Sequence, residues 1–104
     1  MRVEIVDEAI QAGEIVAAMK AGADGAVCVF DGIVRDNSRG RRTLYLDYEA
    51  YREMALEKMR GLAAEAVERF GVRDVAVVHR LGRLMVGETS VLVVVASSHR
   101  GAAF

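Results

Sequence analysis

A run of six apolar residues near the end of the chain constrains the fold most strongly. Val91–Ala96 is long enough for a buried strand, and it leads directly into Ser-Ser-His-Arg at residues 97–100. A strand that ends in hydroxyls, an imidazole and a guanidinium can hold an anion. The serine pair is favoured at helix N-caps, and a helix start attracts phosphate or carboxylate. Too few residues follow, however, for the roughly 12 that an isolated helix needs in water, so no helix is expected there.

Length and composition favour one domain with an apolar core. The chain has 104 residues, of which 53% are hydrophobic. A chain of this size buries about two-thirds of its unfolded surface. We therefore expect residues 1–104 to form a single domain. The formal net charge of −1 argues against a globally basic nucleic-acid-binding protein.

The sequence also disfavours several other classes of protein. Cys28 is the single cysteine and the two histidines are far apart, so we expect no internal disulfide, no metal and no cofactor. Residues 1–8 carry acidic side chains and lack the apolar segment of a signal peptide. Val91–Ala96 is too short to cross a bilayer. The sequence therefore predicts a cytoplasmic protein without a membrane partner.

Periodicity predicts an α+β order of elements. The expected strands are 2–6, 26–34, 43–50, 72–80, 83–86 and 89–98, and the expected helices are 10–19 and 51–70. We expect a mixed sheet packed by the one long helix, which buries a single apolar face, with 26–34 as a central strand. Gly32 marks a bulge or a close backbone approach in that strand, and Gly71 stands where a C-cap glycine belongs.

Three polar segments are candidates for chemistry. The loop Arg35–Arg42 holds four arginines in eight residues, and it should be mobile when nothing is bound. Arg100 would offer a fork for an oxyanion, and His99 could donate to the same group or move a proton. The arginines of both segments would then converge on one anion, unless they form only a solvated turn and an exposed strand end. His79 is interpreted as a structural histidine that caps a turn, and Cys28 as a buried, inert thiol.

Four stretches of the sequence resemble one family. They are GAVCVFDGIVR at residues 25–35, LDYEAY at 46–51, VHRLG at 78–82 and SSHRGAAF at 97–104. In this order and spacing they resemble the large, catalytic subunit of molybdopterin synthase over almost the whole chain. The HRxxAF ending and the F-x-G-x-V-R strand end are the most specific parts of the resemblance.

The resemblance implies an α/β hammerhead-like fold and a homodimer. Each copy would bind one small ubiquitin-like sulfur-carrier subunit, which makes a heterotetramer. In the family, the carrier's C-terminal Gly-Gly thiocarboxylate enters a pocket on the large subunit and gives its sulfur to cyclic pyranopterin monophosphate. Two rounds produce the dithiolene of molybdopterin. The resemblance thus implies a sulfurtransferase of molybdenum cofactor biosynthesis.

Six positions match the family's pterin-phosphate pocket. They are Ile33, Val34, Arg35, His99 and Arg100, with Phe30 at a position that lines the pocket. The arginines of the loop are further candidate contacts, namely Arg39, Arg41 and Arg42. The resemblance therefore assigns substrate binding to both polar segments.

The catalytic residues stay unassigned. The family's catalytic lysines are expected beyond Phe104, and neither Lys20 nor Lys58 matches them. One alternative is therefore a non-catalytic anion-binding or carrier-docking module, a truncated form without these lysines. Another is an RNA-binding α+β domain that uses residues 35–42, which the net charge and the lack of aromatic stacking pairs on the expected strands disfavour.

Overall fold

A four-stranded mixed sheet forms the centre of the computed structural model, which describes residues 1–38, 41–42, 45–48 and 51–104 and the side chains outside 37–50. Its strands are β1 (Arg2–Val6), β2 (Ala26–Ile33), β6 (Asp74–Arg80) and β8 (Thr89–Ser97), in the order β1-β6-β8-β2. β1 and β6 run parallel, whereas the β6–β8 and β2–β8 pairs are antiparallel. The predicted mixed sheet is thus confirmed.

β2 lies at one end of this strand order, so the prediction of a central strand is wrong. The central positions belong to β6 and β8, where Val78, Leu92 and Val94 are buried. In β2, by contrast, Val29 and Phe30 are 47% and 62% exposed. The prediction failed because a short apolar run does not reveal whether a strand has one neighbour or two.

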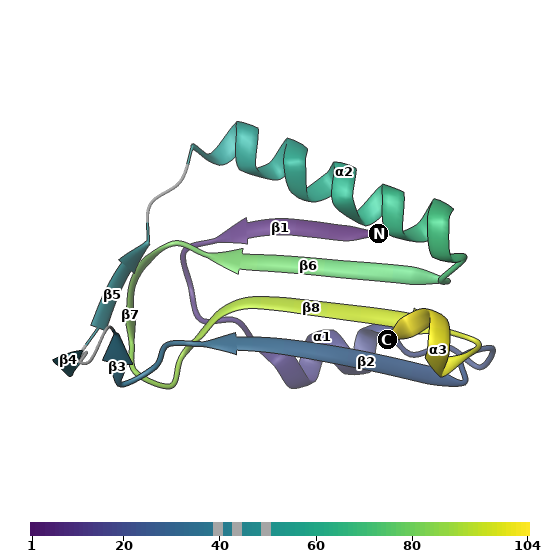
Figure 1. The fold of residues 1–104 in the computed structure, drawn as a ribbon, viewed down its shortest axis with the longest axis horizontal. Helices are drawn as coiled ribbons and strands as arrows, with labels where there is room; N and C mark the ends of the chain where they lie inside the picture. Colours follow the sequence, from purple (N-terminus) through teal and green to yellow (C-terminus); the bar gives the residue numbers. More distant parts are fainter. Residues whose placement is uncertain (39–40, 43–44, 49–50) are drawn as a thin grey trace.

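Two helices cover different halves of the sheet on opposite faces. α2 (Arg52–Phe70) packs on β1 and β6, and α1 (Ala12–Met19) contacts β8 and β2 from the other side (Figure 1). The cluster on the α1 side holds Ile15, Met19, Ala76, Val78, Leu92, Val94 and Ala96, and the cluster on the α2 side holds Ala63, Val72 and Val75. The α+β class is confirmed, with α1 as a second covering helix beside the expected long one.

α2 ends where the sequence predicts. Gly71 has a left-handed φ of 63°, and its N–H donates to the Val67 carbonyl oxygen at 3.0 Å. The predicted apolar face is buried only in part, because several of its large residues are exposed, namely Tyr51, Met54, Leu62 and Phe70. Neither α2 nor any other helix in the described ranges is long and apolar enough to cross a membrane.

Smaller elements depart from the sequence prediction. β3 (Asn37–Ser38) pairs with β4 (Arg41–Arg42), so part of the predicted loop 35–42 is strand. β5 (Tyr45–Tyr48) pairs with β7 (Gly82–Met85) in a separate two-stranded sheet. A short helix, α3 (Arg100–Ala103), follows β8, although the sequence predicted none.

Candidate functional site

The antiparallel β2–β8 pair carries the predicted site residues to opposite ends of the sheet. Its register joins Ala26 to Ser97 at one end and runs to Ile33 at the other. Arg35 follows β2 at the Ile33 end, whereas Arg100 begins α3 at the Ser97 end (Figure 1). At about 3.3 Å per residue, the length of β2 alone separates these ends by about 23 Å. Within one copy the two guanidinium groups therefore do not meet, contrary to the sequence prediction.

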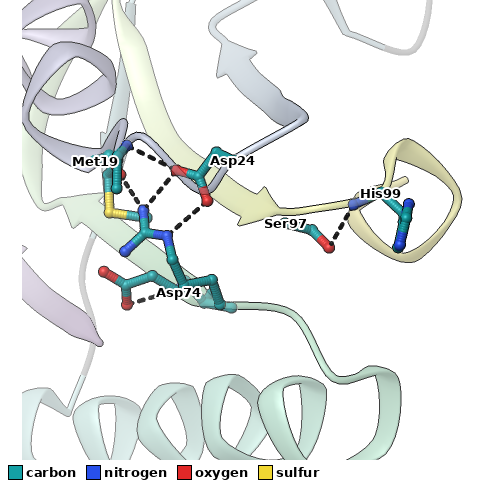
Figure 2. Close-up of polar contacts among 8 residues, drawn as sticks. Met19, Asp24, Asp74, Ser97 and His99 are labelled. Carbon is teal, nitrogen blue, oxygen red and sulfur yellow. Dashed lines mark hydrogen bonds and ion pairs between the residues drawn. The ribbon is translucent and has the colours of Figure 1, made fainter.

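At the His99–Arg100 end a short helix forms, although the sequence predicted none, and neither serine is its N-cap. His99 itself is the N-cap of α3 and makes no side-chain cap hydrogen bond. The Ser97 hydroxyl, 1% exposed as a residue, accepts a hydrogen bond from the His99 N–H at 3.4 Å (Figure 2). The single turn forms because Ala103 is buried, so tertiary packing replaces the missing length.

His99 and Arg100 are both exposed and therefore accessible to a ligand. α3 contains only four residues, so its dipole contributes little to anion binding. An anion at this end would instead be held by the imidazole and the guanidinium, which form charge-assisted hydrogen bonds. The anion-binding chemistry predicted for these two side chains is therefore possible here, and the four-residue helix adds little to it.

A charged pair lies beside this end of β8. Arg73 Nε donates to Asp24 Oδ1 at 2.6 Å, and Arg73 Nη2 donates to Asp24 Oδ2 at 2.8 Å. Nη2 also donates to the carbonyl of Met19, the last residue of α1, and Figure 2 shows Met19 and Asp24 at this contact. Sequence reasoning missed the pair, because 49 positions separate its members and an Asp-Gly step signals only a turn.

The pair also changes the acidity of Asp24. The hydrogen bond from Arg73 lowers the pKa of this carboxyl. Desolvation opposes the change, and the Ala21 N–H, which donates to Oδ2 at 2.8 Å, supports it. Asp24 therefore stays ionised to lower pH than an ordinary aspartate, and the ion pair persists through the neutral range.

Val34 fixes the other end of β2. Its side chain is 2% exposed. Its N–H donates to the Glu88 carbonyl oxygen at 3.1 Å, and its carbonyl oxygen accepts from the Gly87 N–H at 2.9 Å. Since these groups of Val34 are occupied by the protein, Val34 fixes the position of its neighbours Ile33 and Arg35, which are both exposed.

Glu88 orders the turn that contacts Val34. Its carboxylate accepts hydrogen bonds from the Met85 N–H at 2.8 Å and from Arg80 Nη1 at 2.6 Å. These two contacts, that of Met85 first, lower the pKa of Glu88. Sequence reasoning missed this residue as well, because Gly87-Glu88 gives only the signal of a turn. The Arg35 end is thus supported by an acid–arginine pair, as the Arg100 end is.

The sequence interpretation of Gly32 is confirmed, whereas the ring of His79, predicted to cap a turn, contacts strand β8. The β2–β8 register shifts between Gly32 and Ile33, and a Cβ on Gly32 would lie 2.8 Å from Val91 Cγ1. The Ser90 hydroxyl donates to the Gly32 carbonyl oxygen at 3.0 Å, and His79 Nδ1 lies 2.8 Å from the Ser90 carbonyl oxygen. His79 therefore supports the bulge from inside the sheet.

Phe30 lies in an apolar groove on the β2–β8 half of the sheet. The groove has a volume of about 360 Å³ and is lined by Cys28, Val29, Phe30, Val93, Val95, Ala103 and Phe104. Phe30 therefore shares its surroundings with α3. Cys28 is only half-buried, so the prediction of a buried thiol is wrong.

The loop arginines fall largely outside the described part of the chain. Arg39 lies outside the described residues, as do the side chains of Arg41 and Arg42. The backbone of Arg41 and Arg42 pairs with β3. Among the described residues, no group of three or more His, Cys, Asp and Glu side chains is placed to hold a metal ion.

A family model described as MoaE protein matches residues 5–104. The chain belongs to the MoaE protein family. This result confirms the resemblance seen in the four sequence stretches, because the match covers all of them.

Named relatives of this MoaE-family chain are catalytic subunits of molybdopterin synthase. The one from Pyrococcus abyssi is 43% identical over 91 residues, which are 88% of this chain and 62% of that protein. The one from Bacillus subtilis is 37% identical over 103 residues, 99% of this chain and 66% of that protein. The chain thus spans just under two-thirds of the length of these relatives.

Solved structures of this family share the fold. The crystal structure of molybdopterin synthase from Staphylococcus aureus superposes with a TM-score of 0.91 at 38% identity, over 99% of this chain and 75% of that one. A chain from the complex of subunits 1 and 2 of the molybdopterin-converting factor of Helicobacter pylori gives a TM-score of 0.79 at 27% identity, over 96% of this chain and 68% of that one.

Proposed function

We propose that this chain acts as the large, catalytic subunit of a molybdopterin synthase. It binds the C-terminal thiocarboxylate of a small ubiquitin-like carrier and catalyses the transfer of its sulfur to cyclic pyranopterin monophosphate, in two rounds that complete the dithiolene. The observation that carries the proposal is the family match over residues 5–104. The complex of subunits 1 and 2 in Helicobacter pylori supports the carrier as a partner. We place the reaction in the cytoplasm.

The substrates of this reaction are anions, which suits the exposed cations of both ends of the β2–β8 pair. Arg100 offers a bidentate fork to a phosphate or a carboxylate terminus, and His99 adds a donor beside it. Arg35 offers a second fork, held by Val34. The sulfur arrives on the carrier, so the reaction needs no cysteine of this chain.

A second copy of the chain completes the pocket. Arg35 and Arg100 lie at opposite ends of β2, and a twofold axis reverses the direction of that strand. If two copies meet along β2, the Arg35 end of one therefore lies beside the His99–Arg100 end of the other. Exposed apolar residues of β2, such as Phe30 and Ile33, favour this contact. The homodimer then holds two composite pockets and binds two carriers.

Reconstitution tests the proposed function. The chain is incubated with cyclic pyranopterin monophosphate and the thiocarboxylated carrier, and dithiolene formation is measured. We expect product with this carrier and none with a carrier that ends in an ordinary carboxylate. A chain that binds neither the pterin nor the carrier would refute the proposal.

A second candidate function is a module that docks the carrier and binds the anion without turnover. The separation of Arg35 from Arg100 within one copy favours it, because a lone copy presents anion-binding side chains without a complete pocket. The same reconstitution separates the two functions. The synthase forms product in proportion to the dimer present, whereas the docking module binds both ligands and forms none.

A further inference from the structure

The C-terminal end of β8 lies between the first residues of β6 and those of β2, and a backbone hydrogen bond joins it to each side. On one side the Arg73 N–H donates to the Ala96 carbonyl oxygen at 2.9 Å. On the other the Gly25 N–H donates to the Ser97 carbonyl oxygen, also at 2.9 Å. Beyond these contacts the chain leaves the sheet toward α3. The direction in which it leaves therefore depends on where β6 and β2 begin.

The side chains of Asp24 and Arg73 connect these two strand starts. Strands on either side of a common neighbour lie roughly 10 Å apart, beyond the reach of a backbone hydrogen bond. The bidentate pair spans this gap with N–O distances of 2.6 and 2.8 Å. The Asp24 side chain is 5% exposed and that of Arg73 is 35% exposed, so the carboxylate is shielded from solvent while the guanidinium is partly solvated.

Gly25 links the pair to the candidate site. It follows Asp24 directly and faces the Ser98 carbonyl so closely that a Cβ on Gly25 would lie 2.2 Å from that oxygen. The positions of Gly25 and Ser98 are therefore coupled, because neither has room to move toward the other. Ser98 is the residue before His99, so this contact lies one peptide unit from the candidate site.

We propose that Asp24 and Arg73 are positioning residues for the anion site at His99 and Arg100. The pair fixes the separation of the β6 and β2 starts and thereby the end of β8 and the orientation of α3. Its own charges are matched, so it does not bind the ligand. The inference rests on the proposed function, because it takes His99 and Arg100 as ligands of the anionic substrate.

A conservative variant tests the proposal. Arg73→Lys keeps the charge but lacks the bidentate geometry. The matched control is Arg52→Lys, which alters another Arg–Asp pair, with Asp7, at the start of α2. We expect Arg73→Lys to weaken binding of cyclic pyranopterin monophosphate roughly tenfold in calorimetry, as a small misplacement of binding groups does. We expect Arg52→Lys to leave the affinity unchanged.

A spectroscopic readout separates positioning from a general loss of stability. In Arg73→Lys without substrate, we expect the amide signals of residues 98–101 to shift, and those of the first turn of α2, at the end of that helix far from Arg73, to stay in place. If Arg73→Lys does not fold, Asp24→Glu takes its place, since it moves the carboxylate but keeps its charge. Unchanged signals and affinity would overturn the proposal, and so would equal losses of affinity in the Arg73 and Arg52 variants.

If the proposed function is wrong, the variants should give a different pattern of results from the one expected if only the role of Asp24 and Arg73 is wrong. If Arg100→Ala binds the pterin as tightly as the parent chain, Arg100 is no ligand and the assumption about the site is wrong. The amide signals of residues 98–101 still report whether Arg73 sets the geometry of this segment. The two ideas can therefore fail independently.

Discussion

Arg35 and Arg100 extend from opposite ends of the same antiparallel strand pair. No rotation of their side chains closes a gap of about 23 Å along β2. A pocket that uses both arginines therefore draws them from two copies of the chain. The dimer can therefore be tested by substituting Arg35 and Arg100 one at a time.

Mixing two variants that each bind cyclic pyranopterin monophosphate weakly should restore part of the tight binding. Arg35→Ala and Arg100→Ala should each weaken binding of cyclic pyranopterin monophosphate by about 1.5–3 kcal/mol, the cost of a lost charge-assisted contact. After subunit exchange, about a quarter of the pockets should contain both arginines. The number of tight sites is measured by calorimetry. A mixture that binds no better than its components would exclude the composite pocket.

Alanine at Gly25 should destabilise the fold, whereas alanine at Gly22 should not. A Cβ at Gly25 would lie 2.2 Å from the Ser98 carbonyl oxygen, while none of the atoms around Gly22 comes within 4 Å of such a Cβ. We expect Gly25→Ala to lower the free energy of unfolding by about 1–3 kcal/mol, as overpacking does. Gly22→Ala should stay within about 0.5 kcal/mol. Equal urea midpoints for the two variants would contradict this reading of the contact.

Low pH should remove the stabilisation that the ionised Asp24 gives the folded state. Its hydrogen bond from Arg73 lowers the pKa of the folded state below that of the unfolded state. The stabilisation is therefore complete above the unfolded pKa of about 3.9, and it is lost as the pH falls through the folded pKa. Asp24→Asn should be less stable than the parent at pH 7, and the difference should shrink below pH 4. Urea midpoints between pH 7 and pH 2 measure it, and a constant difference would argue against the ion pair.

Two glycines of the α2 region should respond to alanine in opposite directions. Gly71 has a φ of 63°, where an L-residue costs about 1–2 kcal/mol. Gly61 lies inside the helix with open space around it, so alanine there should stabilise the chain by about 0.5–1 kcal/mol. Thermal unfolding of both variants compares the signs. A stabilised Gly71→Ala would contradict the left-handed cap.

Leucine truncation should distinguish the sheet core from the exposed flank of α2. Leu92 is 0% exposed, whereas Leu62 is 68% exposed. Leu92→Ala should cost about 2–5 kcal/mol through lost burial and the cavity left behind. Leu62→Ala should stay within about 0.5 kcal/mol. Denaturant unfolding of both variants measures this, and a large loss at Leu62 would mean that this flank is covered in solution.

Local signals explain which parts of the fold were predictable. The helical period and the glycine that ends it predicted α2 and Gly71, because both depend on backbone conformation over a few residues. The bulge at Gly32 was predictable for the same reason. The exposure of His99 and Arg100 also followed from their place directly after a buried strand.

Contacts between distant segments account for the rest. The order of the strands, and with it the edge position of β2, depends on pairing that no short stretch encodes. α3 forms because Ala103 is buried against the sheet, which propensity alone does not show. The contact between Asp24 and Arg73 likewise exists only once β2 and β6 flank β8. Arg35 and Arg100 lie at opposite ends of the sheet because β2 and β8 pair antiparallel, which neither sequence motif reveals by itself.

The parallel pairing of β1 with β6 sets an order of events on the ribosome. β1 emerges well before β6, yet it needs β6 as its partner. At about 5–20 residues per second, the roughly 70 intervening residues take about 4–14 seconds to synthesise. α2 closes its own turns within that interval, since its hydrogen bonds are local. The nascent chain therefore carries β1 without its partner strand for seconds, so the sheet cannot close until β6 has left the ribosome.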